Sequence, residues 1–478
     1  MSKLKSNFIY NAIYQILILI IPLITTPYVA RTIGAEGVGT YSYTYSIVLY
    51  FMMFALLGMN NYGNREVSKV RDDKEKLNRT FSSIYYLQLI VTLIVSIIYI
   101  IYVLLNSREY FTIQIIQVLY LVSVAFDINW LFCGLQKFKM TVTRSAILKI
   151  LNLVLILIFV KDAEDLNKYI FILAFMTLLN QLILWPFRKK EVSFIRVSRK
   201  EIFKHLKPTI ILFIPVLASS VYRTMDKIMI GKMANMSEVG YYENAEKMLN
   251  IVLSVINALG TVTLPQMTYL YSKENLEEFK RIFKKSISFV FFSVFPVIFG
   301  FLATADILVL LYLGEGFTES AVLLKVLSIS LIFTSVASII RMQLLIPRGK
   351  DKEYTTSILI GAIVNFIFNM IFIRRYGAIG ATIGTILAEF LVCFFQCMAI
   401  RKDINLKEYL PSCLKFFITS LVMFIIVYFV GKNMEKTLLT LVIQVTLGVF
   451  IYCILNYKYI KSQIAMFINR KKGVVNNE

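Results

Sequence analysis

Residues 33–41 read Ile-Gly-Ala-Glu-Gly-Val-Gly-Thr-Tyr and join two long apolar runs, residues 7–30 and 38–60. Glycines at such short spacing favour a turn. Each flanking run is long enough for an α-helix to cross the hydrocarbon core, which takes about 20 residues. The first run continues to Ala30, too far for a cleaved signal peptide. We therefore predict two retained membrane-spanning helices connected by a tight glycine turn.

Similar apolar runs continue along the chain, which is 58% hydrophobic and 17% charged, with a mean hydropathy of +0.70. This composition predicts lipid, not water, as the solvent. The fold class is therefore all-α polytopic membrane protein, with about fourteen transmembrane helices. The fourteen predicted spans are 7–30, 38–60, 81–105, 113–135, 143–160, 168–187, 209–231, 245–271, 286–312, 321–346, 354–373, 379–400, 416–431 and 437–456.

The glycine turn has a counterpart 201 residues later. Residues 232–242 read Lys-Met-Ala-Asn-Met-Ser-Glu-Val-Gly-Tyr-Tyr, which aligns Val38-Gly39 with Val239-Gly240. Six predicted helices separate the two turns, so both lie on the same side of the membrane. A parallel repeat of this kind is typical of transporters whose two halves move against each other around a central site.

Charge predicts the orientation and the domain limits. Lys and Arg number 36 in the termini and even-numbered loops against 10 in the odd-numbered loops, so both termini are predicted to be cytoplasmic. The same rule explains the net charge of +22 better than nucleic-acid binding does. The predicted parts are an N-terminal lobe (1–187), a basic cytoplasmic linker (188–208), a C-terminal lobe (209–400), two further helices (401–456) and a basic tail (457–478).

The linker between the lobes is the most basic loop. Its eight basic residues alternate with apolar ones, which predicts an amphipathic helix at the membrane surface. They are Arg188, Lys189, Lys190, Arg196, Arg199, Lys200, Lys204 and Lys207. The basic tail is expected to rest on anionic lipid.

The sequence lacks the residue patterns of a disulfide framework, a zinc site or a nucleotide-binding loop. The five cysteines lie in or beside apolar runs and the single histidine, His205, lies in the linker, so neither a disulfide framework nor a zinc site is expected. The cluster of Gly34, Gly37 and Gly39 lacks the preceding strand and the following Lys-Ser/Thr of a nucleotide-binding loop. No cofactor is predicted.

Three segments together resemble the polysaccharide-transporter (Wzx-type) flippases of the MOP exporter superfamily. The first is Tyr28-Val-Ala-Arg-Thr-Ile-Gly34 followed by Gly37-Val-Gly-Thr-Tyr41. The second is Tyr222-Arg-Thr-Met-Asp-Lys-Ile-Met-Ile-Gly231 followed by Val239-Gly-Tyr-Tyr242. The third is Tyr376-Gly-Ala-Ile-Gly-Ala-Thr-Ile-Gly384, between the eleventh and twelfth spans. In this order and spacing, the resemblance covers essentially the whole chain.

The resemblance implies a V-shaped arrangement of two six-helix lobes with two extra C-terminal helices. It also implies a flippase of the bacterial cytoplasmic membrane that moves an undecaprenyl-diphosphate-linked oligosaccharide from the inner to the outer leaflet, for capsule or surface polysaccharide assembly. The implied partners are a polysaccharide polymerase and glycosyltransferases. Such a polar cargo needs a lined path, since unsatisfied polar groups in hydrocarbon cost several kcal/mol each.

Basic residues inside or at the end of spans are the candidates for binding the diphosphate and sugars. Arg223, Asp226 and Lys227 share one helix face, where Asp226 would organise two cations around the diphosphate. Arg31 offers a guanidinium fork that matches phosphate oxygens. Lys149 and Arg341 lie deeper from the cytoplasmic side, where either could line an inward-facing cavity. The alternative for all of these cations is a local ion pair or a side chain that snorkels to the headgroups.

Asp127 and Glu389 are acids well inside apolar runs. One of them could carry a coupling H+ or Na+, because burial raises the pKa of a carboxyl group. The alternative, which we favour, is a structural partner for a lysine or arginine. Asn180, Gln181, Asn365 and Asn369 could contact sugar hydroxyls, although hydrogen bonds between helices are the commoner use of such residues.

Three other functions compete with the flippase. A multidrug and toxin extrusion antiporter has the superfamily fold, but a pump for cationic drugs should favour acids, and here the basic residues within spans are more numerous. A flippase for a peptidoglycan lipid precursor is not excluded by charge. A membrane enzyme such as a glycan polymerase is disfavoured by the short external loops and by the cytoplasmic position of His205.

Overall fold

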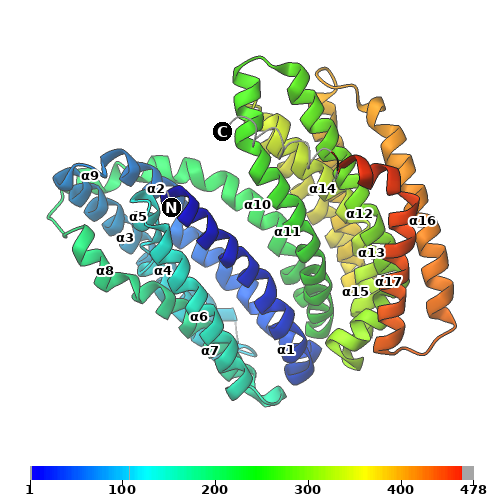
Figure 1. Ribbon diagram of the computed structural model, residues 1–478. Coiled ribbons are helices and arrows are strands. Elements are labelled where there is room, and N and C mark those ends of the chain that lie inside the picture. The colour runs from blue at the N-terminus through cyan, green and yellow to red at the C-terminus, as the bar shows by residue number, and fades with distance from the viewer. Residues whose placement is uncertain (1–2, 107, 464, 466–478) are drawn as a thin grey trace. The chain divides into compact units, whose positions relative to one another are not determined.

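The structure is a computed structural model that describes residues 3–106, 108–463 and 465. Every regular element among these residues is helical (Figure 1). This follows from the composition, because a helix satisfies all its backbone hydrogen bonds internally and so tolerates lipid. The chain divides into two compact units, Met1–Glu243 with Asn369–Ala381, and Asn244–Phe368 with Thr382–Glu478.

Ten α-helices belong to the first unit. They are α1 (Lys3–Leu56), α2 (Met59–Val70), α3 (Lys74–Asn106), α4 (Phe111–Ala125), α5 (Asn129–Gly134), α6 (Phe138–Phe159), α7 (Leu166–Leu182), α8 (Leu184–Glu191), α9 (Arg199–Phe203) and α10 (Leu206–Met233).

The second unit contains most of the remaining helices, and α11 and α15 run through both units. They are α11 (Met236–Ser272), α12 (Leu276–Leu313), α13 (Thr318–Ser328), α14 (Ser330–Ile340), α15 (Asp351–Ile400), α16 (Leu410–Lys432) and α17 (Leu438–Leu455). A π-helical turn, Arg341–Leu345, extends α14.

Glycine breaks divide the two longest helices. In α1, Gly34 has φ 77° and ψ 176°, and in α15, Gly377 has φ 55° and ψ −134°. Both conformations are costly for residues with a side chain. Gly34 lies in the turn predicted between the first and second spans, and Gly377 lies in the motif quoted between the eleventh and twelfth spans. Both glycines form sharp breaks inside long helices.

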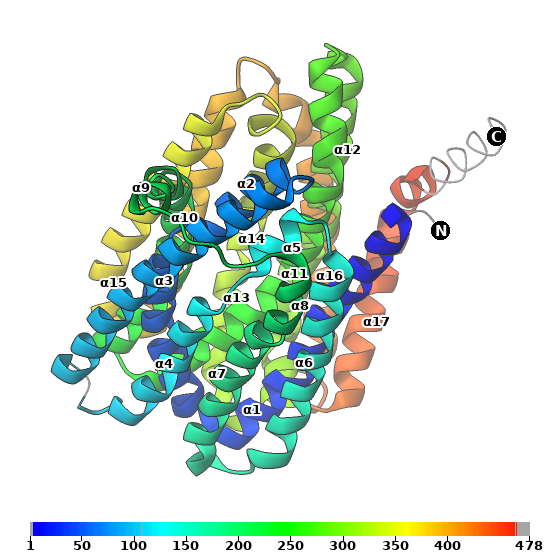
Figure 2. The same cartoon turned by 90° about the vertical axis from the view of Figure 1, so that its left-hand side faces the viewer.

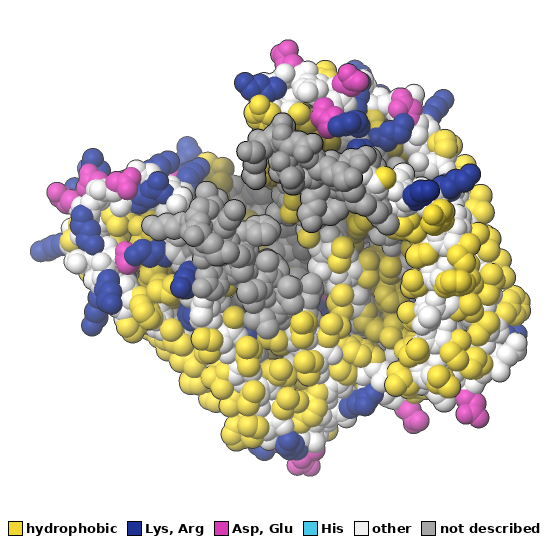
Figure 3. All heavy atoms as spheres, in the orientation of Figure 1, with side chains coloured by type: hydrophobic (Ala, Val, Ile, Leu, Met, Phe, Trp, Pro, Cys, Tyr) yellow, Lys and Arg dark blue, Asp and Glu magenta, His cyan; other side chains and the backbone are white. Residues whose placement is uncertain are grey.

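The described part of the chain contains ten helices long and apolar enough to cross a membrane, or eleven if the bent pair 315–328 and 330–345 forms one span. In this tally, α1 and α15 each contribute a single helix. On the face shown in Figure 3, apolar side chains cover the middle of the helices, while charged side chains gather toward their ends. The chain is a multi-pass helical membrane protein.

The linker differs from the single amphipathic helix that we predicted. It consists of the end of α8, an extended segment at residues 192–198, and the short helix α9 (Figure 2). The backbone N–H of Ser193 donates to Asn78 Oδ1 at 2.8 Å, and that of Ile195 donates to Ser82 Oγ at 3.1 Å. Side chains of α3 thus satisfy the extended backbone, which removes the need for a helix there.

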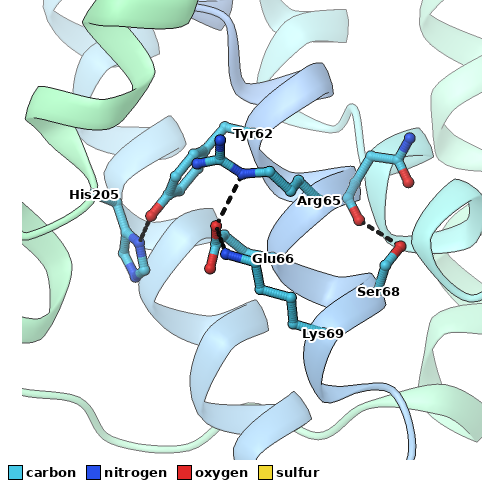
Figure 4. A network of polar contacts seen from close by, with 7 residues as sticks. Tyr62, Arg65, Glu66, Ser68, Lys69 and His205 are labelled. Carbon is cyan, nitrogen blue, oxygen red and sulfur yellow. Dashed lines mark hydrogen bonds and ion pairs between the residues drawn. The ribbon is translucent and has the colours of Figure 1, made fainter. Parts of the chain in front are cut away.

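His205 ties the start of α10 to α2 and α3. Its Nδ1 is 2.6 Å from Tyr62 Oη (Figure 4), and its Nε2 is 2.9 Å from Ser83 Oγ. The imidazole is 4% exposed, and burial, with the nearby charge of Lys204, lowers its pKa to about 4. The histidine is therefore a neutral structural bridge at physiological pH.

Candidate functional site

The two repeat-related glycines bring helices α1 and α11 into backbone contact. A Cβ atom on Gly39 would lie 1.7 Å from the carbonyl oxygen of Met236, and one on Gly240 would lie 2.0 Å from that of Ala35. Gly39 and Gly240 are 201 positions apart, and so are Ala35 and Met236. Each copy of the repeat therefore places its glycine against the same position of the other copy, as a local two-fold relation requires.

An ion pair lies next to this crossing. Lys227 Nζ of α10 is 2.6 Å from Glu243 Oε2 of α11, and Ser42 Oγ of α1 donates to the same oxygen at 2.8 Å. The side chains of Lys227 and Glu243 are only 16% and 14% exposed. Ser42 and Glu243 are also 201 residues apart, so the repeat relation continues through this contact.

Asp226, the neighbour of Lys227, has a different set of partners. Its carboxylate accepts hydrogen bonds from Tyr242 Oη and from Asn369 Nδ2, both at 2.6 Å. The residue is 3% exposed and Asn369 is fully buried. We name Ser42, Asp226, Lys227, Tyr242, Glu243 and Asn369 the α10 cluster.

The predicted face of helix α10 is thus held from three other helical segments. The sequence placed Asp226 between two cations, whereas the contacts join Asp226 to Tyr242 and Asn369 and join Lys227 to Glu243. An incoming phosphate would have to compete with Glu243 for the ammonium group of Lys227. The described residues contain no group of three or more His, Cys, Asp or Glu side chains suited to hold a metal ion.

Two arginines that the sequence predicted as phosphate ligands lie on the helices that carry this cluster. Arg31 is in α1 and its side chain is exposed. Arg223 is in α10, four residues before Lys227, and its side chain lies outside those that the structure describes.

Asp127 belongs to a second polar network, at the break between α4 and α5. Its Oδ1 accepts the backbone N–H and the side-chain Nδ2 of Asn129, both at 2.9 Å. Asn129 Oδ1 accepts from Arg144 Nη2 at 2.9 Å, and Asn129 Nδ2 donates to Gln181 Oε1 at 2.8 Å. Ser145 Oγ links to Asn180 at 3.4 Å. This geometry favours the structural alternative for Asp127, Asn180 and Gln181.

Arg144 was missed by the sequence analysis. It lies just inside the predicted fifth span, 143–160, but was not named among the candidates. It is 8% exposed within α6 and joined through Asn129 to Asp127. Lys149 is five residues further along the same helix and half-buried. Arg144 is thus the basic residue of α6 that meets the buried acid.

Arg341, in the second unit, begins the π-helical turn after α14. Its Nη1 donates to Tyr354 Oη at 3.3 Å, and its guanidinium lies 5.6 Å from the centre of the Tyr354 ring. Nη2 is 3.5 Å from Ser338 Oγ, which donates to Asn257 Oδ1 at 2.7 Å. Such turns occur often at functional sites. The residue is half-buried, as the snorkelling and the cavity hypotheses both allow.

The remaining charges predicted in the second unit differ in their surroundings. Lys325 Nζ contacts both carboxylate oxygens of Asp306, at 2.7 and 2.6 Å, and the two residues form a local ion pair. Glu389 is half-buried on α15, one turn before Cys393.

A comparison with protein families identifies the chain. The model of a family described as polysaccharide biosynthesis protein matches residues 4–271, more than half of the length. The chain belongs to this family. A relative 23% identical over 408 residues is the "Putative O-antigen transporter" of Escherichia coli (strain K12), with 84% of this chain and 97% of the relative covered. Another is the capsular polysaccharide biosynthesis protein CapF of Staphylococcus aureus, 24% identical, covering 80% of this chain and 96% of CapF.

Two solved structures show the same fold. The lipid II flippase MurJ in an inward closed conformation aligns with a TM-score of 0.76 at 15% identity, covering 96% of this chain and 99% of MurJ. An inward-facing multidrug resistance MATE family transporter of the MOP superfamily aligns with a TM-score of 0.63 at 14% identity, covering 81% of this chain and 94% of the transporter. The family member described here therefore has the MOP-type helical fold.

Glu243 and Tyr242 are the functional candidates that sequence reasoning missed in the second repeat. Tyr242 ended the quoted motif and Glu243 directly follows it. The sequence signal available for Glu243 is its position in the repeat, because it is an acid that directly follows the second motif where the first copy has Ser42.

Proposed function

We propose that this protein is a flippase that moves undecaprenyl-diphosphate-linked oligosaccharide units from the inner to the outer leaflet of the bacterial cytoplasmic membrane. The family match carries this proposal, supported by relatives that are aligned over nearly their whole length and named for O-antigen transport and capsular polysaccharide biosynthesis. The product would feed capsule or surface polysaccharide assembly, beside a polymerase and glycosyltransferases. The protein itself catalyses no bond change in this scheme.

The proposed topology has fourteen spans with both termini in the cytoplasm. Dividing α1 and α15 at Gly34 and Gly377 adds two spans to the ten apolar helices. The bent pair adds one, and the 28-residue helix α10 adds the last. The lobes proposed from the repeat are residues 1–187 and 209–400, joined by the linker and followed by two helices at 401–456.

The proposed mechanism is alternating access around a cationic site. Lys227 in the α10 cluster would exchange its partner Glu243 for the diphosphate, with Arg31 and Arg223 as further phosphate ligands and with Lys149 and Arg341 along the path. Exchange of one anion for another keeps Lys227 compensated. Glu243 would keep its hydrogen bond from Ser42 and would have to take up a proton or another cation, because an unpaired buried charge costs several kcal/mol. Asp226, Asp127 and Glu389 are the proposed sites for organising the cations or for a coupling H+ or Na+.

The experiment is flipping of a fluorescent diphosphate-linked oligosaccharide in proteoliposomes. Wild-type protein is compared with Lys227→Ala, with the double variant Arg223→Ala, Lys227→Ala, and with Lys325→Ala as a matched control that breaks an ion pair elsewhere. We expect export by wild type and by the control, and at least a tenfold loss in the two test variants. Equal export by all variants would support the flippase function and would show that Lys227 is not part of the substrate-binding site.

The same reconstituted protein distinguishes the competing functions. Transport of lipid II in place of the oligosaccharide would indicate a peptidoglycan-precursor flippase. Proton- or sodium-driven efflux of a cationic dye, without movement of either lipid, would assign the protein to drug antiport.

A further inference from the structure

An open groove lies between α3 and the linker. Its volume is about 610 Å3, and its walls are mostly apolar. The residues that matter are Leu89 and Ile90 of α3, Phe194 and Ile195 of the extended segment, Ile202 of α9, and one charged residue, Arg196.

The extended segment that lines this groove is held by polar contacts. The backbone hydrogen bonds of Ser193 and Ile195 to α3 hold the extended segment. The guanidinium of Arg188 lies 4.5 Å from the centre of the Phe194 ring, an arrangement that orients the ring. The groove is therefore preformed, and a ligand that enters it does not have to order the linker first.

The floor of the groove continues along α3 as an exposed apolar stripe. Ile90 is followed at helical spacing by Ile94, Ile97, Ile101 and Leu104, which are 52%, 50%, 49% and 62% exposed. At 1.5 Å per residue, the stripe from Ile90 to Leu104 is about 21 Å long. This exceeds the roughly 15 Å of hydrocarbon in one leaflet. A lipid chain that starts in the groove can remain on protein to its end.

The surroundings of the groove are positively charged. Residues 188–207 contain eight basic and two acidic residues. Both acids already have basic partners, since Glu201 Oε1 lies 3.4 Å from Arg79 and Glu191 pairs with Lys137. Arg196 remains exposed at the groove itself. An arginine presents a planar fork that matches phosphate oxygens.

We propose that this groove binds one anionic phospholipid of the cytoplasmic leaflet, with a phosphate at Arg196 and an acyl chain along Ile90 and the α3 stripe. The combination of a basic rim with an apolar floor fits a lipid with a charged headgroup better than it fits a soluble anion or a neutral lipid. The inference rests on the cytoplasmic side proposed above for the linker, but it does not require that the protein transports anything.

Tryptophan fluorescence gives a local readout. The chain has two tryptophans: Trp130 is 1% exposed, whereas Trp185 stacks on Phe194 with ring centres 6.3 Å apart. Full-length protein is placed in nanodiscs of phosphatidylcholine with a minor fraction of phosphatidylglycerol. In one set the phosphatidylglycerol is brominated, and in the other set an equal amount of the phosphatidylcholine is brominated instead. Trp185→Phe supplies the background from Trp130.

We expect brominated phosphatidylglycerol to quench Trp185 about fivefold more effectively than the same amount of brominated phosphatidylcholine does. This ratio corresponds to about 1 kcal/mol for one basic contact. Arg196→Gln should abolish the preference and Ile90→Phe should reduce quenching by filling the groove. Lys189→Gln, which removes a linker charge outside the groove, should retain both.

Equal quenching by the two lipids, or equal loss in Lys189→Gln and Arg196→Gln, would overturn the proposal. Displacement by an equimolar polyprenyl diphosphate would also overturn it, because the occupant would then be the cargo. The measurement involves no transport, so a failure of the flippase assay leaves its outcome unaffected.

Discussion

The two copies of the repeat share a close backbone contact and differ in charge. Residues 22–43 form the first copy and residues 223–244 the second, with an offset of 201. Gly39 and Gly240 make the same close contact from opposite sides. Where the second copy has Asp226 and Lys227, the first has Thr25 and Thr26, and Thr25 Oγ1 merely donates to its own helix at Ile21 O.

The difference teaches that crossing the helices and placing the charges are separate tasks. Both copies need a glycine, because no side chain fits between the two backbones. Only the second copy carries the acid, the lysine and Glu243, where the first has Ser42. A purely structural role would be expected to treat both copies alike, so the asymmetry favours a functional role for the α10 cluster.

The largest effect is expected at the shared feature. Gly39→Ala or Gly240→Ala would place a methyl group within about 2 Å of a backbone carbonyl, which the helices can relieve only by separating. We expect each change to destabilise the protein by at least about 3 kcal/mol. The check is thermal unfolding in detergent, with Gly300→Ala as control, because a Cβ atom there meets nothing within 4 Å. A tolerated Gly240→Ala beside a disruptive Gly39→Ala would break the equivalence of the copies.

The second effect concerns the charge that only one copy has. Lys227→Met leaves Glu243 without its ammonium partner, and Glu243→Gln does the reverse, at a cost of about 3 kcal/mol for a largely buried pair. The exchanged pair Lys227→Glu, Glu243→Lys should recover stability but not export, if Lys227 binds the cargo from its own position. Recovery of both would indicate that the pair serves folding alone.

How far the sequence predicted this arrangement can be seen in the same residues. The helices and the glycine breaks follow from local patterns, since each depends on residues close together in the chain. The repeat follows from comparing two such patterns 201 residues apart. The partner of Lys227 does not, because it depends on how α10 packs on α11. Arg144 was overlooked for a similar reason, because its hydrogen-bond partner Asn129 lies in another helix.

The third effect compares two ways of making the same bend. Gly34 has φ 77°, and the equivalent Asn235 instead accepts a hydrogen bond from the N–H of Glu238 at 3.0 Å through its Oδ1. Gly34→Ala should cost about 2 kcal/mol from backbone strain. Asn235→Ala should cost about 1 kcal/mol from loss of the cap. Unfolding midpoints of both variants test this order, and a larger loss at Asn235 would reverse it.

The smallest effect is expected on the pH dependence of stability. It concerns His205, which anchors the start of α10, the helix in which the second copy begins. Its pKa of about 4 is below the ordinary value of 6.5, so the folded protein binds fewer protons than the unfolded chain between these values. Stability contributed by the neutral histidine is therefore complete above pH 6.5 and falls as the pH drops toward 4. We expect a loss of about 1 kcal/mol between pH 7 and pH 5 after allowance for solvent screening. His205→Gln should flatten that part of the pH profile, and an unchanged profile would contradict the bridge.

The π-helical turn at Arg341–Leu345 has a consequence for how the helix after α14 tolerates changes in length. The N–H of Ile346 bonds to the carbonyl of Arg341, five residues back, so this turn holds one residue more than an α-helical turn. Gln343, inside the turn, donates to Thr263 Oγ1 and Ser286 Oγ at 2.7 and 2.8 Å. Because the extra residue is accommodated within a single turn, deleting one residue here would restore ordinary α-helical winding and leave the later side chains in their present orientation. The same deletion in a regular α-helix would rotate every later side chain by about 100°, the angle per residue. The turn is therefore a place where the chain can lose one residue at the expense of the local contacts of Gln343 alone.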